Sequence, residues 1–388
     1  MRIAIVGYGT AGQAAAIFLA RDGHDVEVFE QSDVLKPVGA GFLLQPTGLS
    51  VLTALGLREA VLARGARIER LHGANAADTA IMDMRYTDHA PESFGLGMTR
   101  GALFALLHVA CADVPIHTGI RIAKTSDDGR GLIDDAGNEY GPFDLIIAAD
   151  GANSTLRTST KIARRDPAYP WGAMWCLLPA DGWPHASELR QRYDGTRTML
   201  GVLPVGTRPE HGGRWLTFYY SLPGARVDAF DGAALAAMHA DVARLWPELA
   251  ERTRAILDVT QLNRARYRDV VLRKPWRGRV VFIGDAAHGM SPQLGQGVNM
   301  ALLDALALAD VLRTHTDVEH ALVHYARTRA SHIAVYQRLS RWLTPLFQSD
   351  FAMLGTLRDR AFGPFGQMPF ARREMLKILT GTKRGWFG

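Results

Sequence analysis

Three glycines near the start of the chain have the spacing of a nucleotide-binding turn. The segment Gly7-Tyr-Gly9-Thr-Ala-Gly12 follows an apolar run at Arg2–Val6 and opens a helical pattern at Thr10–Arg21. In a strand–turn–helix unit the first glycine permits the tight turn, the second lets a diphosphate approach the backbone, and the third allows close packing of the helix. The free N–H groups at the start of the helix favour an anion. The sequence therefore predicts a dinucleotide site.

A carboxylate stands where such a site needs one. A second apolar strand, Asp25–Phe29, is followed at once by Glu30. At the end of the second strand of a βαβ unit, a carboxylate can accept hydrogen bonds from the ribose of the nucleotide. The strand, the helix and the second strand together predict a parallel sheet.

Two later strands also end in an acidic residue beside glycine. The strand Asp144–Ala149 leads into Asp150-Gly151, with Ser154 and Arg157 just beyond, and the strand Arg279–Ile283 leads into Gly284-Asp285. Ligands of open α/β folds bind at the carboxyl ends of the strands, so we expect both turns at one edge of the sheet.

The second of these turns continues into a glycine-rich loop that opens a helix at Val298–Arg313. The N–H groups of this helix start can stabilise a developing negative charge. His288 lies in the same segment. A single histidine in such a position is more often structural than catalytic, and we interpret it as structural.

With these three motifs in order, residues 1–315 resemble the class A flavoprotein monooxygenases, the p-hydroxybenzoate hydroxylase-like family. The resemblance implies an α/β fold in which a Rossmann-like FAD-binding domain is interrupted by a β-rich substrate domain, followed by C-terminal helices. We place the discontinuous FAD-binding domain at 1–165 and 271–315, the substrate domain at 166–270 and a helical segment at 316–388.

The resemblance also implies cofactor contacts for individual residues. Gly7, Gly9, Ala11 and Gly12 would serve the FAD diphosphate, and Glu30 the adenosine ribose. Arg100 would reach the ribityl–diphosphate region, Asp285 would bind the ribityl chain, and Asp150 belongs to a motif associated with both FAD and NAD(P)H. The flavin ring would be lined by Gly295, Gln296, Gly297, Val298 and Asn299.

The activity that the resemblance implies is hydroxylation of a small aromatic or heteroaromatic, phenol-like substrate. NAD(P)H would reduce the flavin, O2 would give a C4a-hydroperoxide, and the distal oxygen would pass to the ring. The chain has one dinucleotide fingerprint, assigned to FAD, so the choice between NADH and NADPH stays open. N-hydroxylation, epoxidation and a non-catalytic flavin-binding role are the alternatives.

Candidate pocket residues lie on two predicted strands. Tyr219 and Tyr220 are neighbours on one strand, so alternation sends their side chains to opposite faces. Met174 and Trp175 on another strand pose the same choice, and core packing is the alternative for all four. Pro292 is expected near the reactive edge of the flavin. The sequence identifies no catalytic base.

Composition and charge narrow the remaining possibilities. The chain has 388 residues, a formal net charge of +5, and basic residues in no long block, which argues against nucleic-acid binding. Two cysteines and the absence of CxxC or HExxH motifs argue against a metal site. No apolar run is long enough for a membrane span, and we expect a cytoplasmic enzyme, either monomer or homodimer. The apolar tail from Phe351 onward could cover its own domain, form a dimer contact or lie on a membrane; we favour the first.

Overall fold

A parallel sheet forms the centre of the first domain. The computed structural model describes residues 1–35, 41–209 and 211–386. The six strands lie in the order β20-β21-β12-β1-β2-β8, and all neighbouring pairs are parallel except β20 with β21. Their bounds are β20 (Trp276–Arg277), β21 (Val280–Phe282), β12 (Leu145–Ala148), β1 (Arg2–Val6), β2 (Asp25–Phe29) and β8 (Ile116–His117).

Both faces of this sheet are buried, which explains its continuous apolar strands. Along β1, Ile3 and Ile5 join one core with helices α1 (Thr10–Arg21) and α10 (Gly297–Thr314). Ala4 and Val6 point the other way, into a second core. That face carries α5 (Thr155–Thr160) and a small sheet of β9 (Ile122–Thr125), β10 (Leu132–Asp134) and β11 (Glu139–Tyr140). The predicted opening of the fold is confirmed.

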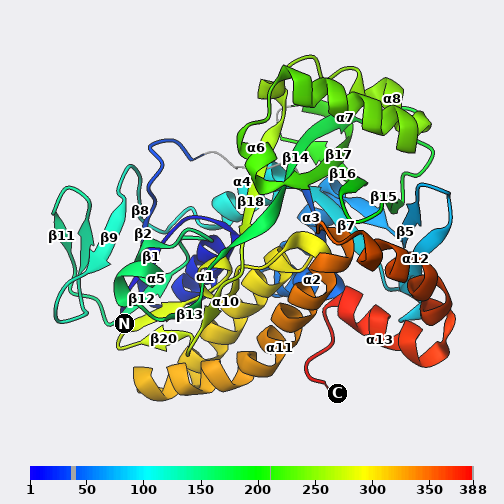
Figure 1. The fold of residues 1–388 in the computed structure, drawn as a ribbon. Helices are drawn as coiled ribbons and strands as arrows, with labels where there is room; N and C mark the ends of the chain where they lie inside the picture. Colours follow the sequence, from blue (N-terminus) through cyan, green and yellow to red (C-terminus); the bar gives the residue numbers. More distant parts are fainter. Residues whose placement is uncertain (36–40, 210, 387–388) are drawn as a thin grey trace.

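A second, mostly antiparallel sheet lies above the first domain (Figure 1). Helices α6 (Gly224–Asp228), α7 (Gly232–Leu245) and α8 (Pro247–Thr253) cover its outer face. This confirms the expected β-rich layer with a helix packed on it. In spatial order the strands are β18 (Asn263–Arg268), β14 (Ala168–Pro179), β17 (His211–Pro223), β16 (Thr198–Arg208), β15 (Glu188–Asp194), β5 (Arg70–Asn75) and β6 (Ala80–Arg85).

The last two strands of this sheet come from the segment 1–165, which the sequence analysis placed in the FAD-binding domain. β5 pairs in parallel with β15, with Arg70 opposite Glu188. Local periodicity does not show that a strand pairs with another strand so far along the chain. For this reason the predicted substrate domain, 166–270, does not include β5 and β6. The division into domains as drawn from the sequence stays a prediction.

A small three-stranded sheet connects the two large ones. It consists of β3 (Gly41–Leu44), β7 (Gly95–Thr99) and β4 (Ala66–Ile68), flanked by α2 (Pro46–Ala54), α3 (Arg58–Arg64) and α4 (Arg100–Ala110). A Cβ atom on Gly97 would lie 1.8 Å from the carbonyl oxygen of Pro204, so β7 meets β16 backbone to backbone. Only glycine permits that approach.

Three helices complete the chain. α11 (Val318–Phe347) lies within the segment 316–388 that was expected to be helical, and it packs on α10. α12 (Ala352–Gln367) lies against β6, and α13 (Pro369–Thr380) buries Leu376 and Leu379 in a core shared with β3 and β5. α13 and one side of α12 thus pack on the rest of the chain, which is the arrangement that the sequence analysis favoured. Among the described residues no helix is long and apolar enough to cross a membrane.

Candidate active site

The three glycines of the first motif have three different surroundings. Gly7 has φ +101°, and a Cβ atom there would meet the carbonyl oxygen of Ala149 at 2.5 Å. A Cβ atom on Gly12 would lie 2.0 Å from the carbonyl oxygen of Gly7, whereas one on Gly9 would have no neighbour within 4 Å. The turn is therefore closed at Gly7 and Gly12 and open at Gly9, at the N-terminus of α1.

A cavity of about 270 Å³ opens beside this turn. Glu30 lines it, with one carboxylate oxygen 2.8 Å from the backbone nitrogen of Tyr8 and the other 3.0 Å from that of Ser32. These amides donate to the carboxylate and fix its position at the cavity wall. The lining residues are Tyr8, Gly9, Thr10, Glu30, Gln31, Ser32, Leu35, Phe42, Arg100 and Phe104. Ala11 is buried beneath the turn, with its Cβ facing Gly284.

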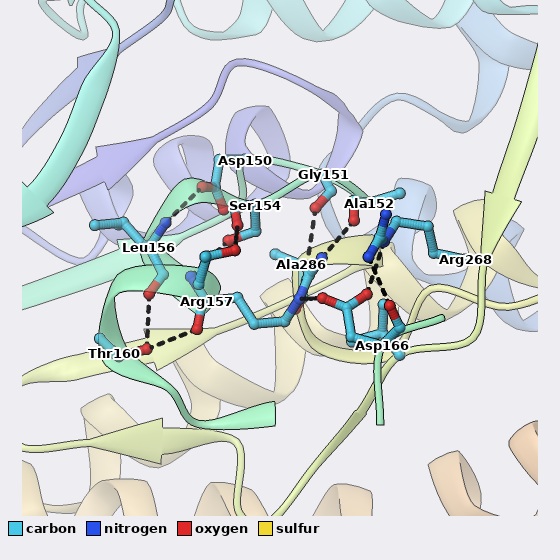
Figure 2. A network of polar contacts seen from close by, with 12 residues as sticks. Asp150, Gly151, Ala152, Ser154, Leu156, Arg157, Thr160, Asp166, Arg268 and Ala286 are labelled. Atoms are coloured by element: carbon cyan, nitrogen blue, oxygen red, sulfur yellow. Dashed lines mark hydrogen bonds and ion pairs between the residues drawn. The ribbon is translucent and has the colours of Figure 1, made fainter. Parts of the chain in front are cut away.

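A buried arginine joins the other two motifs, as Figure 2 shows. Arg157 is 1% exposed, and its guanidinium donates to the carbonyl oxygen of Ala286 at 3.1 Å and to the Asp166 carboxylate at 2.9 Å. Arg268 of β18 donates to the other oxygen of Asp166 at 2.7 Å. The arginine therefore ties the Asp150 turn to the Gly284 turn, and Asp166 links both to the second sheet.

Asp150 is half-buried and follows strand β12 by two residues. One carboxylate oxygen accepts the backbone N–H of Leu156 at 3.3 Å, while the other is buried without a hydrogen-bond partner among the described residues. Burial raises the pKa of Asp150 above its ordinary value. A carboxyl group with a free oxygen at this edge can still hydrogen-bond a ligand.

The Gly284–Asp285 turn is held from below by a network of buried charges. Asp304 of α10 accepts the backbone N–H of Gly284 at 2.9 Å, contacts His288 Nε2 at 2.5 Å and accepts Arg329 Nε at 2.7 Å. Burial alone would raise the pKa of Asp304, but His288 and Arg329 outweigh it, and the pKa lies below its ordinary value. His288 is thus structural in this arrangement, whereas the Asp285 side chain is exposed.

Two side chains of the glycine-rich loop point away from solvent and hold the loop in place. Gln296 donates to the carbonyl oxygen of Leu379 at 2.8 Å, and Asn299 accepts the backbone N–H of Gln45 at 2.8 Å. The surfaces left for a ligand are the backbone of Gly295 and Gly297 and the half-buried Val298. The Cβ position of Gly297 is 3.8 Å from an Asp285 oxygen, so these two sites are neighbours.

Arg100 connects the cavity beside Gly9 with the second sheet. It is the first residue of α4, lines the cavity, and its guanidinium carbon lies 5.8 Å from the ring centroid of Trp175 on β14. Trp175 pairs with Tyr219 across β14 and β17. The aromatic face of the second sheet therefore begins beside the cavity.

The two tyrosines of β17 do lie on opposite faces. Tyr220 is buried under α7 and donates to Asp241 at 2.8 Å, in one core with Met174. The Tyr219 oxygen accepts Gln348 Nε2 at 3.0 Å. Pro292 is half-buried in the loop that follows His288, and contacts between that loop and α11 hold it.

Two further polar residues belong to this face and were not predicted. Burial raises the pKa of Tyr267 on β18, Tyr219 raises it further and Arg100 opposes the rise, so the three groups share one neighbourhood. Gln348 follows α11. Tyr267 lies in the segment Asn-Arg-Ala-Arg-Tyr-Arg, and Gln348 follows a long helix. Neither residue belongs to a sequence motif that would indicate a function.

Sequence comparison defines the class of protein that this fold and site represent. A family model described as FAD binding domain matches residues 1–338. The chain is 31% identical over 380 residues to 3-amino-4-hydroxybenzoate 2-monooxygenase of Streptomyces cremeus, covering 93% of this chain and 91% of that one. It is 30% identical to kynurenine 3-monooxygenase of Salinispora tropica, covering 87% and 78%.

Structure comparison agrees at the level of the fold. A Klebsiella pneumoniae protein solved with FAD and uric acid superposes with a TM-score of 0.82 at 22% identity, covering 100% of this chain and 98% of that one. The chain belongs to the FAD-binding domain family and, within it, to the class A flavoprotein monooxygenases. It is an FAD-dependent monooxygenase of the aromatic hydroxylase type, as its sequence motifs predicted.

Proposed function

We propose that this enzyme hydroxylates a small aromatic or heteroaromatic ring bearing a phenol-like hydroxyl group, with NAD(P)H and O2 as co-substrates. The observation that carries the proposal is the contact between Arg100, which lines the cofactor cavity, and Trp175 on the aromatic face of the second sheet. A flat ring placed against Trp175 and Tyr219 would lie between that sheet and the cofactor. The name of one relative, 3-amino-4-hydroxybenzoate 2-monooxygenase, supports a ring with a hydroxyl group, and that of another, kynurenine 3-monooxygenase, supports an aromatic ring more broadly.

The residues of the chain would hold FAD along the edge of the parallel sheet. The open Gly9 backbone and the α1 N-terminus suit the diphosphate, Glu30 the adenosine ribose, and the exposed Asp285 the ribityl chain. Arg100 and Asp150 would serve the diphosphate region, and residues 295–299 would line the flavin ring. When bound, FAD accepts reducing equivalents from NAD(P)H and activates O2 for transfer.

Tyr219 lies on the same face of the second sheet as Trp175 and carries a neutral phenol group, so it is suited to orienting the substrate. Burial raises the pKa of Tyr219, so the phenol stays neutral at pH 7 and cannot act as a free base. Its oxygen accepts the Gln348 amide and its hydroxyl group lies within hydrogen-bonding reach of Tyr267, so the O–H can donate either to Tyr267 or to a substrate. We therefore assign Tyr219 the role of donating a hydrogen bond to an oxygen on the substrate, with Trp175 packing on the ring.

A matched pair of neighbouring substitutions tests this role. Tyr219→Phe removes a hydrogen bond worth about 1–1.5 kcal/mol, so kcat/KM for the best substrate should fall about tenfold. Tyr220→Phe removes the bond to Asp241 on the other face; it should leave kcat/KM within about twofold and lower the free energy of unfolding by about 1 kcal/mol. Steady-state kinetics and urea unfolding measure both. A loss of activity in Tyr220→Phe alone would show that the face is assigned wrongly.

A further inference from the structure

Exposed apolar side chains concentrate at one end of the described chain. Val109 and Leu257 are isolated examples elsewhere, and single exposed residues of this kind need no explanation. The segment 351–370 is different, because six large apolar side chains there are more than half exposed. These are Phe351, Met353, Leu357, Phe365, Met368 and Phe370.

The exposed residues of α12 follow the spacing of one helix face. Met353 and Leu357 are separated by four positions, and Ala361 and Phe365 continue the same interval, all four being exposed. The opposite side of the helix packs on the second sheet, where a Cβ atom of Gly355 would lie 3.1 Å from the Gly195 backbone. Figure 1 shows α12 and α13 at the edge of the molecule, on the side away from β20 and β12.

The last part of the chain, from residue 351 to residue 388, carries the whole net charge, and the apolar segment 351–370 within it carries +1. Residues 351–388 contain seven of the 44 lysines and arginines but two of the 39 acidic residues, so the remainder, with 37 of each, is neutral. Both acidic residues are paired, Asp359 with Arg358 and Glu374 with Lys377 and Lys383. Arg360, Arg373 and Arg384 are exposed and form no ion pair with any described residue.

An exposed apolar helix face that carries the unpaired Arg360, within the basic end of the chain, suits an anionic, partly apolar surface. A symmetric contact between two copies through this face would bring the two basic ends of the chain close together. A bilayer with anionic headgroups accepts both features, because the apolar side chains enter the headgroup boundary and the arginines meet the lipid phosphates. We propose that the face formed by α12 and the following residues to Phe370 docks on an anionic lipid surface, lying on the bilayer without crossing it.

Vesicle sedimentation with the full-length, FAD-loaded enzyme tests this proposal. We expect binding to vesicles of phosphatidylcholine mixed with phosphatidylglycerol, at least about tenfold weaker binding to pure phosphatidylcholine, and loss of binding in high salt. The double variant Met353→Ser, Leu357→Ser should weaken binding to the anionic vesicles at least about tenfold. The matched control Val109→Ser, Leu257→Ser removes two equally exposed apolar residues elsewhere and should change binding less than about twofold.

A charge variant separates the two contributions. Arg360→Glu, Arg373→Glu should reduce binding to anionic vesicles by more than about tenfold and leave the FAD content and melting temperature unchanged. Equal binding to neutral and anionic vesicles, or equal losses in both apolar double variants, would overturn the proposal. So would a dimer in solution that Met353→Ser, Leu357→Ser dissociates while no vesicle binding is seen, because the face would then be a contact between copies.

Discussion

At the glycine-rich turn 7–12, we expect one glycine to affect mainly FAD binding and another to affect the stability of the fold as well. Gly9 has open space where a Cβ atom would lie, whereas Gly12 has the carbonyl oxygen of Gly7 at 2.0 Å. Gly9→Ala should therefore leave the melting temperature of the apoprotein within about 2 °C but weaken FAD binding at least tenfold, because the methyl group occupies the approach of the diphosphate. Fluorescence titration of the apoprotein with FAD and thermal unfolding measure the two effects.

Gly12→Ala is the matched comparison for that prediction. The added methyl group forces α1 away from β1, so both the melting temperature and FAD affinity should fall. If Gly9→Ala destabilised the apoprotein as much as Gly12→Ala, the turn would not be open in the way described, and the diphosphate would have to bind elsewhere.

At the scale of elements, α11 connects the cofactor turn with the end of the chain. Arg329 contacts both Asp304 and His332 Nδ1, the latter at 2.8 Å, and His332 Nε2 donates to the carbonyl oxygen of Gly381 at 3.1 Å. Burial and the charge of Arg329 lower the pKa of His332 to about 4, against an ordinary value near 6.5. The neutral ring therefore accepts from Arg329 and donates to the residue that follows α13.

This link predicts a dependence of stability on pH. Because the unfolded chain binds a proton at His332 below about pH 6.5 and the folded chain only near pH 4, the stabilisation is complete above pH 6.5 and declines as the pH falls. Between pH 7.5 and pH 5 this histidine should account for a loss of about 2 kcal/mol in the free energy of unfolding. His332→Gln should remove that part of the decline in urea unfolding, and the exposed His320→Gln should not; equal slopes in all three proteins would contradict the assignment.

The elements that could be predicted from the sequence are those with local signals. The βαβ opening at 2–29 has glycine spacing and apolar strands, and α11 has sustained helical periodicity. Strands β3 to β7 and β15 were not predicted, and β5 finds its partner in β15 far along the chain, which local periodicity does not show. Tyr267 and Gln348 were missed for the same reason: their importance comes from the side chains they meet in space.

At the scale of the whole molecule, the candidate active site lies where the carboxyl edge of the parallel sheet meets the second sheet. Arg157 and Asp166 join the carboxyl edge of the parallel sheet to β18, and Arg100 lies between the cofactor cavity and Trp175. The cofactor residues could be proposed from three motifs, because each follows a strand of the same sheet. Strand alternation predicts that Tyr219 and Tyr220 lie on opposite faces of the second sheet, but it does not say which of them faces the pocket. Only the structure distinguishes the two tyrosines.

The most direct test of the central claim is the consumption of NADH, NADPH and O2 by the purified, FAD-loaded enzyme across a panel of phenolic and N-heteroaromatic acids. The account predicts that one class of compound strongly stimulates consumption and yields a product heavier by one oxygen atom, placed on a ring carbon. Oxygen found on nitrogen or across a double bond, or no stimulation by any compound despite bound FAD, would contradict assignment as a ring hydroxylase of phenol-like substrates.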